Sequence, residues 1–169
     1  IGGGYTWGAQ DEGDSIETIR AAIDVGINMF DTAEFYADGY SEEVLGKGLS
    51  GQRDKVLVAT KVWPDNLTAD KLVQACERSL KRMNTDYIDL YQIHWANWDV
   101  PLEETLSAME KLKQDGKIRF VGDSNFGVRD LTEALGCAEV VSDQLISSLL
   151  FRAIEYEILA KCREAEVGV

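Results

Sequence analysis

KVLVATKVWPDNLTADKLVQACERSLKRMNTDYIDLYQIH, residues 55–94, contains two strand patterns joined by one helix pattern. The strand patterns, KVLVATK and DYIDLYQIH, are nearly continuous apolar runs, as expected for strands covered on both faces of a parallel sheet. Thr68 is a candidate N-cap for the helix between them. The apolar side chains of that helix recur on one face, at Val73, Cys76, Leu80 and Met83. The stretch therefore predicts one strand–helix–strand unit.

The alternation continues upstream of this unit. An amphipathic helix with Asp14 as its expected N-cap ends at Gly26 and is followed by the strand INMFD, residues 27–31. A short helix in SEEVLGKGL, residues 41–49, leads from that strand into the central unit. The upstream part therefore predicts one more strand with a helix on each side of it.

The alternation also continues downstream. A helix with Pro101 near its first turn ends at Gly116, before the strand KIRFVGDSN. Three further patterns follow: a helix at 128–136, a strand at 139–144 and a final helix at 153–167. The strands begin roughly 20 to 30 residues apart, which is the size of a strand-plus-helix unit.

Two α/β architectures fit this alternation, a (β/α)8 barrel and a doubly wound sheet. No GxGxxG turn follows any strand, and the IGGG segment at residues 1–4 precedes no obvious phosphate-binding helix. No linker rich in Pro, Gly or Ser divides the chain. The sequence therefore favours part of a (β/α)8 TIM barrel, forming a single domain over residues 1–169.

Composition argues against several classes of function. A formal charge of −13 and a pI near 4.4 disfavour binding to nucleic acid or to an anionic membrane. No apolar run is long enough to span a bilayer, and no secretory leader opens the sequence. The three cysteines are far apart and lack CxxC spacing, so we expect neither a disulfide framework nor a metal site. These observations predict a cytoplasmic protein with a small-molecule substrate.

Every predicted strand delivers polar side chains at its carboxyl end. In chain order these are Asp31, Lys61, His94, Ser124 with Asn125, and Gln144. The carboxyl ends of barrel strands converge on one face, where the chemistry of such barrels takes place. We therefore expect these residues to share one site.

Asp31, Lys61 and His94, together with Tyr36 in the loop after Asp31, suit the protonation of an oxygen atom. A phenol has a reference pKa of about 10, and a nearby cation such as Lys61 favours its phenolate. Asp31 offers the compensating charge that a lysine in an apolar bowl requires. A neutral His94 can hydrogen-bond a carbonyl oxygen and orient it toward Tyr36.

Each of these residues has a simpler interpretation when it is taken singly. A lone histidine at a strand end is usually just a hydrogen-bonded side chain, and a lone lysine is usually a surface residue. Their combination at ordered strand ends favours a catalytic set. Trp63 and Trp95 follow Lys61 and His94 closely, and we expect them to line an apolar substrate pocket; packing against loops is an equal alternative.

At these residues the sequence closely resembles the aldo-keto reductases, which are NAD(P)H-dependent carbonyl reductases built on a (β/α)8 barrel. The motifs that carry the resemblance are DTAEFYADGYSEEVLGKGL, LVATK, TDYIDLYQIHW and PLEETLSAMEKLKQDGKIRFVGDSNF. They cover nearly the whole chain. The beginning of the chain is most similar to bacterial soluble reductases of the family.

The resemblance implies hydride transfer from a nicotinamide cofactor to an aldehyde or ketone. It implies that Tyr36 donates the proton, that Lys61 lowers the pKa of Tyr36, that Asp31 pairs with Lys61, and that His94 positions the carbonyl. The residues that the resemblance implies for holding the nicotinamide are Asp31, Ser124, Asn125 and Gln144. The expected cofactor is NADPH, with NADH possible.

The sequence departs from the family pattern near the expected cofactor site. Asp123 occupies a position that is commonly apolar, and a buried carboxylate costs several kcal/mol unless it is paired or protonated. Asp143 replaces a common Asn. Ile146 and Ser147 occupy the place of an aromatic residue that many members keep beside the cofactor.

Length is the largest departure, because a complete barrel of this class needs about 250 residues. The predicted strands correspond to the second to sixth strands of such a barrel, with the seventh beginning at VGV, so we expect truncation at both ends. Two alternatives to a working reductase stay open: a non-catalytic member that binds cofactor or a partner, and an inert barrel fragment. The substrate and the oligomeric state stay open as well.

Overall fold

Five parallel strands form one sheet in the order in which they occur in the sequence. They are β1 (Met29–Asp31), β2 (Leu57–Val62), β3 (Ile88–Ile93), β4 (Ile118–Ser124) and β5 (Val140–Gln144). The computed structural model describes Gly8 and residues 10–169, so the IGGG segment lies outside the described residues. A doubly wound sheet reverses its strand order at a switch point, whereas this sheet runs in sequence order. The predicted partial barrel is confirmed.

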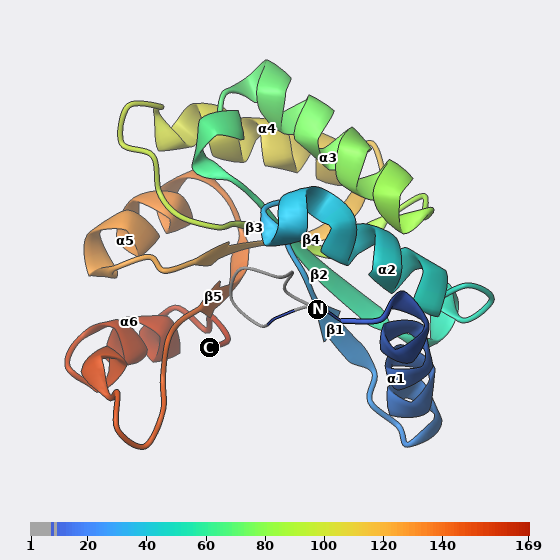
Figure 1. Ribbon diagram of the computed structural model, residues 1–169. Coiled ribbons are helices and arrows are strands. Elements are labelled where there is room, and N and C mark those ends of the chain that lie inside the picture. The colour runs from blue at the N-terminus through green and yellow to red at the C-terminus, as the bar shows by residue number, and fades with distance from the viewer. Residues whose placement is uncertain (1–7, 9) are drawn as a thin grey trace.

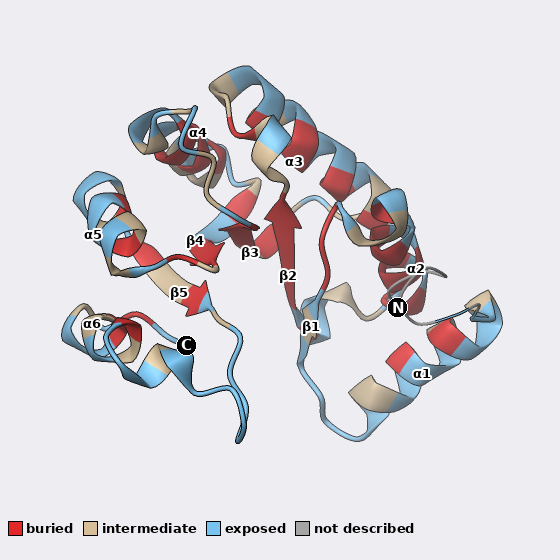
Figure 2. Ribbon diagram, turned by 60° about the vertical axis from the view of Figure 1, so that its left-hand side comes forward, coloured by how far each residue is buried: buried red, intermediate tan, exposed pale blue. Residues whose placement is uncertain are grey.

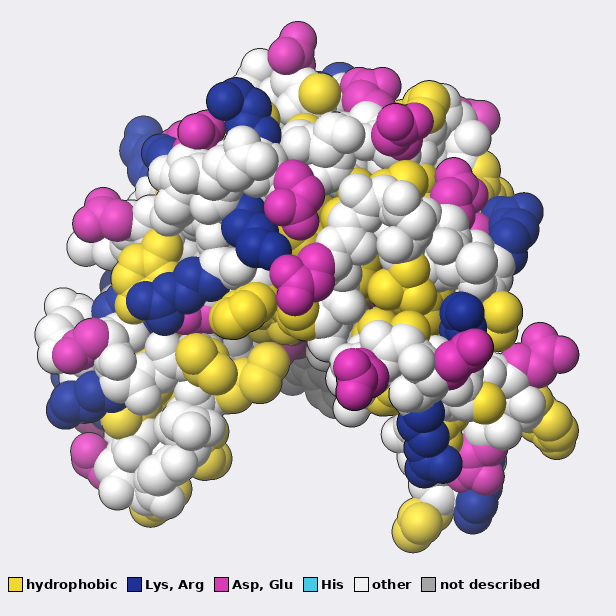
Figure 3. Space-filling model, turned by 180° about the vertical axis from the view of Figure 1, so that it is seen from behind, with side chains coloured by type: hydrophobic (Ala, Val, Ile, Leu, Met, Phe, Trp, Pro, Cys, Tyr) yellow, Lys and Arg dark blue, Asp and Glu magenta, His cyan; other side chains and the backbone are white. Residues whose placement is uncertain are grey.

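The helices cover the outer face of the curved sheet and form an arch (Figure 1). They are α1 (Glu12–Asp24), α2 (Tyr40–Gly48), α3 (Ala69–Met83), α4 (Leu102–Gln114), α5 (Val128–Cys137) and α6 (Ile158–Glu164). From behind, a hollow is visible between the two ends of the arch (Figure 3). None of the described helices combines the length and the apolar character needed to cross a membrane.

Side chains alternate between the two faces of the sheet, as the pleat requires. Tyr91 and Val121 are cross-strand partners that are fully buried in the core cluster formed with the helices. Met29 and Leu57, partners at the beginning of β1 and β2, are 50% and 47% exposed on the other, concave face. Figure 2 shows the same division, with buried segments on the strands and on the helix surfaces turned toward them.

One helix cap differs from the sequence prediction, and a second is the predicted residue but does not make the capping hydrogen bond. Asp11, not Asp14, is the N-cap of α1, and its carboxylate accepts a hydrogen bond from the Asp14 backbone N–H at 3.1 Å. Asp14 instead lies in the first turn, where a negative charge is favoured by the helix dipole. Thr68 is the N-cap of α3 as predicted, but the Glu104 carboxylate accepts the hydrogen bond from the Ala69 N–H, at 2.9 Å.

Pro101 lies next to the first residue of α4, as predicted, and is its N-cap. The carboxyl-terminal end of the chain, by contrast, is less helical than its pattern predicts. The predicted helix at 153–167 is confined to α6, after a 3₁₀ turn at Ala153–Glu155. Residues 153–157 contribute no buried side chain, so little apolar burial supports an earlier helix start. Gly168 forms a parallel bridge with Ser142, which places the VGV segment beside β5.

The amino ends of the strands are tied together by the buried Asp89 carboxylate. It lies 2.6 Å from Arg53 and 2.7 Å from Arg119, and it accepts the Val58 N–H at 2.9 Å. Both guanidinium groups lie over the Tyr87 ring, at 4.2 and 4.1 Å from its centroid. This charged cluster joins β2, β3 and β4 at the end of the sheet opposite to the predicted site.

Candidate active site

Lys61 and Asp31 form an ion pair at the carboxyl ends of β1 and β2. Lys61 Nζ lies 2.7 Å from both Asp31 carboxylate oxygens and donates to the Thr32 carbonyl at 2.9 Å. Lys61 is 1% exposed, whereas the Asp31 side chain is 36% exposed. Burial lowers the pKa of Lys61, and the charge of Asp31 opposes this shift. The pair is asymmetric, since the ammonium depends on its partner more than the carboxylate does.

Tyr36 and His94 border this ion pair. Tyr36 begins a 3₁₀ turn after β1, and its ring centroid lies 5.2 Å from Lys61 Nζ. The Tyr36 and His94 rings meet edge to face, with centroids 5.6 Å apart. The structure therefore brings together all four residues of the predicted catalytic set, from three strand ends and one loop.

The environment of Tyr36 keeps its hydroxyl protonated. Burial raises the pKa of Tyr36, and the negative charge of Asp31 raises it further. Asp31 also neutralises the Lys61 cation with both carboxylate oxygens. A net pKa-lowering effect of Lys61 on Tyr36 is therefore not visible in this arrangement.

His94 is held as a neutral imidazole. It is 7% exposed, and burial, with a further contribution from the Lys61 cation, lowers the pKa of His94 to about 4. Its Nδ1 atom has no hydrogen-bond partner among the described residues. The Asn125 side-chain amide donates to the His94 backbone carbonyl at 3.0 Å, which fixes the end of β3. A neutral imidazole can hydrogen-bond a polar ligand through its other ring nitrogen, Nε2.

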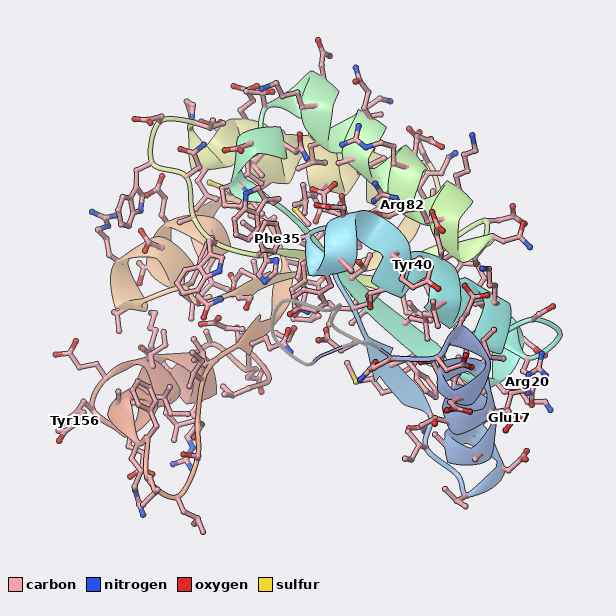
Figure 4. All side chains as sticks on the ribbon, in the orientation of Figure 1. Glu17, Arg20, Phe35, Tyr40, Arg82 and Tyr156 are labelled. Atoms are coloured by element: carbon pink, nitrogen blue, oxygen red, sulfur yellow. The ribbon has the colours of Figure 1, made fainter. Side chains whose placement is uncertain are left out.

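Aromatic rings form one wall of the site. Phe35 and Trp63 stack with centroids 3.8 Å apart, and the Trp63 ring meets His94 edge to face at 5.3 Å. Phe35 is 52% exposed and lies beside the first turn of α2 (Figure 4). Trp95, by contrast, is 46% exposed and has no aromatic partner among the described residues. Trp63 thus lies beside His94, and Phe35 adds an aromatic surface that sequence reasoning missed.

The carboxyl ends of β4 and β5 present a polar cluster next to the ion pair. Ser124 Oγ donates to the Gln144 carbonyl at 2.9 Å, and the Asn125 side-chain amide donates to Ser124 Oγ at 2.9 Å. Gln144 Nε2 lies 3.3 Å from Asp31 Oδ2, which connects this cluster to the ion pair. Gln92, which sequence reasoning missed, donates to Gln144 Oε1 at 3.2 Å. A signal was present, because Gln92 lies two residues before His94, and side chains two positions apart along an extended chain share a face.

Glu34 ties the loop that carries Tyr36 to the end of β2. Its carboxylate is buried and accepts hydrogen bonds from the Trp63 N–H at 2.7 Å and the Asn66 side-chain amide at 2.9 Å. Arg78 of α3 lies 3.6 Å away. Sequence reasoning missed this residue, because an acid in a loop carries no pattern that distinguishes a buried tie from a solvated side chain.

The polar cluster fits a nicotinamide carboxamide, which needs both hydrogen-bond donors and acceptors. The Ser124 hydroxyl, the Asn125 amide and the exposed Gln144 amide supply both kinds of group at one edge of the concave face. In the part of the chain that the structure describes, no group of three or more His, Cys, Asp or Glu residues could hold a metal ion. These residues could hold a carboxamide group next to the Asp31–Lys61 pair.

Known proteins share both the sequence and the fold. The sequence model that describes the aldo/keto reductase family matches residues 1–169 of this chain. Methylglyoxal reductase YeaE of Escherichia coli is 43% identical over 157 residues, which cover 91% of this chain and 55% of that protein. The NADH-specific methylglyoxal reductase of Escherichia coli is 35% identical over 192 residues, with 100% of this chain and 59% of that protein covered.

The fold is similar to that of solved family structures. A crystal structure of an aldo/keto reductase from Klebsiella pneumoniae, in complex with NADP and acetate, superposes with a TM-score of 0.89 at 40% identity. The match covers 92% of this chain and 56% of that one. The chain thus spans little more than half the length of the relatives it matches. With its motifs, its strand order and the clustering of Asp31, Tyr36, Lys61 and His94, the chain belongs to the aldo/keto reductase family.

Proposed function

We propose that the protein is an NAD(P)H-dependent carbonyl reductase that converts aldehydes or ketones to alcohols. The observation that carries this proposal is the gathering of Asp31, Tyr36, Lys61 and His94 at the carboxyl ends of the strands. The two Escherichia coli relatives are named methylglyoxal reductases, which supports a small carbonyl compound as substrate.

The cofactor completes the proposal by supplying the hydride when it is bound. Ser124, Asn125 and Gln144, together with Asp31, would hold its nicotinamide. NADPH is the first candidate because the Klebsiella pneumoniae structure contains NADP. NADH is the second, because one Escherichia coli relative is NADH-specific.

The residues of the site have complementary roles in the proposed reaction. Tyr36 donates its hydroxyl proton to the substrate oxygen, and its raised pKa keeps that proton in place at neutral pH until it is needed. The Lys61 ammonium lies 5.2 Å from the Tyr36 ring centroid, so it partly offsets the repulsion between Asp31 and the phenolate that remains. Neutral His94 hydrogen-bonds the same substrate oxygen, and the Phe35–Trp63 stack borders the apolar part of the substrate.

The test is the substitution Tyr36→Phe in the full-length protein. Loss of a positioned proton donor should lower turnover of a small aldehyde by about 100-fold or more. The dissociation constant for NADPH should stay unchanged, because the phenol is not part of the proposed carboxamide contacts. Tyr156→Phe is the matched control, since Tyr156 is 88% exposed at the α6 end of the arch (Figure 4).

Two outcomes would contradict the proposal in different ways. If Tyr36→Phe keeps wild-type turnover, the proton-donor role is wrong. If the wild-type protein binds NADPH but reduces none of a broad panel of carbonyl compounds, a non-catalytic cofactor-binding function is favoured instead.

The proposal includes a cytoplasmic location, since Cys76, Cys137 and Cys162 are free thiols, as is usual in a reducing compartment.

A further inference from the structure

Two carboxyl groups face each other on the outer side of the sheet. Asp123 of β4 and Asp143 of β5 are direct cross-strand partners, and they are 1% and 0% exposed. A register shift between Val121 and Asp123 brings Asp143 into this position. One Asp143 oxygen accepts the Phe126 N–H at 3.4 Å. Apart from the opposing carboxyl group, the other three oxygens of the pair have no hydrogen-bond partner among the described residues.

The surroundings do not neutralise two negative charges. The titratable groups that act on the pair from the covering helices are Asp130 of α5 and Cys162 of α6. No lysine or arginine of the described residues forms an ion pair with either carboxylate. Two ionised carboxylates in contact and out of water would repel strongly. A single proton between them removes the repulsion and creates a hydrogen bond from one carboxyl group to the other.

The direction of both pKa shifts agrees with this picture. Burial, with the neighbouring Asp143, raises the pKa of Asp123 to about 9, and burial raises the pKa of Asp143 to about 6. Such values belong to the pair rather than to either residue alone. Between these two values the pair holds one proton.

The carboxyl pair adjoins the proposed nicotinamide-binding residues. Ser124 and Gln144 follow Asp123 and Asp143 directly and are themselves cross-strand partners. Their side chains point to the opposite, concave face, as alternation along a strand requires. The Ser124 hydroxyl and the Asn125 N–H both bond the Gln144 carbonyl, at 2.9 and 3.1 Å. Any separation of the two aspartates therefore moves these residues as well.

We propose that Asp123 and Asp143 form a one-proton carboxyl pair that holds the ends of β4 and β5 together and so positions Ser124 and Gln144 for cofactor binding. The positioning role rests on the proposed function, whereas the shared proton does not. Loss of the proton at alkaline pH loosens the β4–β5 junction and weakens cofactor binding.

The sign of the pH dependence follows from the raised values. Both groups bind their protons more tightly in the folded protein than at the ordinary value of 3.8. The stability that they contribute is therefore fully present below about pH 4 and is lost as pH rises through about 6 and then about 9. Acidic groups with lowered values would show the opposite trend.

The test compares the full-length wild-type protein with Asp123→Asn. An asparagine can still donate a hydrogen bond to Asp143, but it cannot titrate. At pH 7 the wild type should show the infrared band of a buried protonated carboxylic acid, and the variant should lack it. The melting temperature of the variant should also fall less between pH 5 and pH 10.

Cofactor binding gives the second readout. The dissociation constant for NADPH in the wild type should rise between pH 7 and pH 10, with a limit of about tenfold per pH unit after the second ionisation. Asp123→Asn should flatten this rise. Lys61 contributes the same background to both proteins, so the difference between them is the measured quantity. Asp115→Asn, at an exposed position that ends α4, is the matched control and should keep the wild-type slope.

Each arm can overturn the proposal. Absence of the protonated-acid band from the wild type at pH 7 would refute the shared proton, and an unchanged binding slope in Asp123→Asn would refute the positioning role. If the full-length protein binds no NADPH, the proposed function fails, but the infrared and melting data still decide the shared proton. Should Asp123→Asn not fold, Asp143→Asn removes the same pair and replaces it in all measurements.

Discussion

Replacing Asp31 and replacing Lys61 should lower the free energy of unfolding by very different amounts. Asp31→Asn leaves a lysine that is 1% exposed with the Thr32 carbonyl as its main remaining partner. Lys61→Met leaves a carboxylate whose side chain is 36% exposed and which keeps its contact with the Gln144 amide at 3.3 Å. An uncompensated buried charge is costly, whereas a partly solvated one is not.

The size of the effect can be bounded from the chemistry of the lysine. Removal of one partner of a buried pair typically costs about 3–5 kcal/mol. The buried amine can also release its proton, which limits the loss at pH 7 to about 4.6 kcal/mol for a lysine with a reference pKa of 10.4. We therefore expect Asp31→Asn to lower the free energy of unfolding by about 3–4.6 kcal/mol. Lys61→Met should change it by less than about 1 kcal/mol.

The assay is urea unfolding of the full-length protein without cofactor, followed by tryptophan fluorescence at pH 7 and pH 9. A deprotonated Lys61 binds fewer protons in the folded than in the unfolded state, so stability rises with pH. The deficit of Asp31→Asn should therefore shrink between pH 7 and pH 9, by up to about 1.4 kcal/mol per unit. The double variant should resemble Lys61→Met. Equal losses for both single variants, or a deficit that grows with pH, would refute the reasoning.

Two further predictions concern the site, and a third concerns the opposite end of the sheet. The pKa of His94 is lowered to about 4, so a pH titration of turnover should show no inflection near pH 6.5. The unfolded state binds this proton more tightly than the folded state, so the melting temperature should fall as pH drops from about 6.5 toward 4. Glu34→Ala leaves the Trp63 N–H and the Asn66 amide unpaired and should lower kcat/KM about tenfold in steady-state assays, with NADPH affinity retained. Asp89→Ala uncouples two arginines at the far end of the sheet and should cost about 3–5 kcal/mol in urea unfolding, while Asp86→Ala, at an exposed neighbouring position, should not.

The strand ends show how far the sequence predicts the site. Asp31, Lys61 and His94 lie at the carboxyl ends of three consecutive strands, and parallel strands in sequence order place these ends together. Their proximity could therefore be expected without coordinates. Gln92 was within reach of the same reasoning, because the period of two in a strand places it on the face of His94.

Contacts that join residues from separate loops could not be predicted in this way. Glu34 accepts a hydrogen bond from the Trp63 N–H, and Phe35 stacks on the Trp63 ring, because the loop after β1 folds over the end of β2. No periodicity governs such a loop, so the direction of its side chains is set by packing. The shorter final helix has a similar cause, since burial of Ile158 and Cys162 determines its extent.

By itself the amino-acid sequence determined the parallel β/α architecture and the group of residues at its polar end, because apolar periodicity and strand ends are local properties of a chain. The tertiary structure decided the protonation states of those residues. Burial keeps His94 neutral and Tyr36 protonated, and the register of β4 and β5 places Asp123 opposite Asp143. Desolvation and charge–charge distance control these properties, and both exist only after distant segments have packed together.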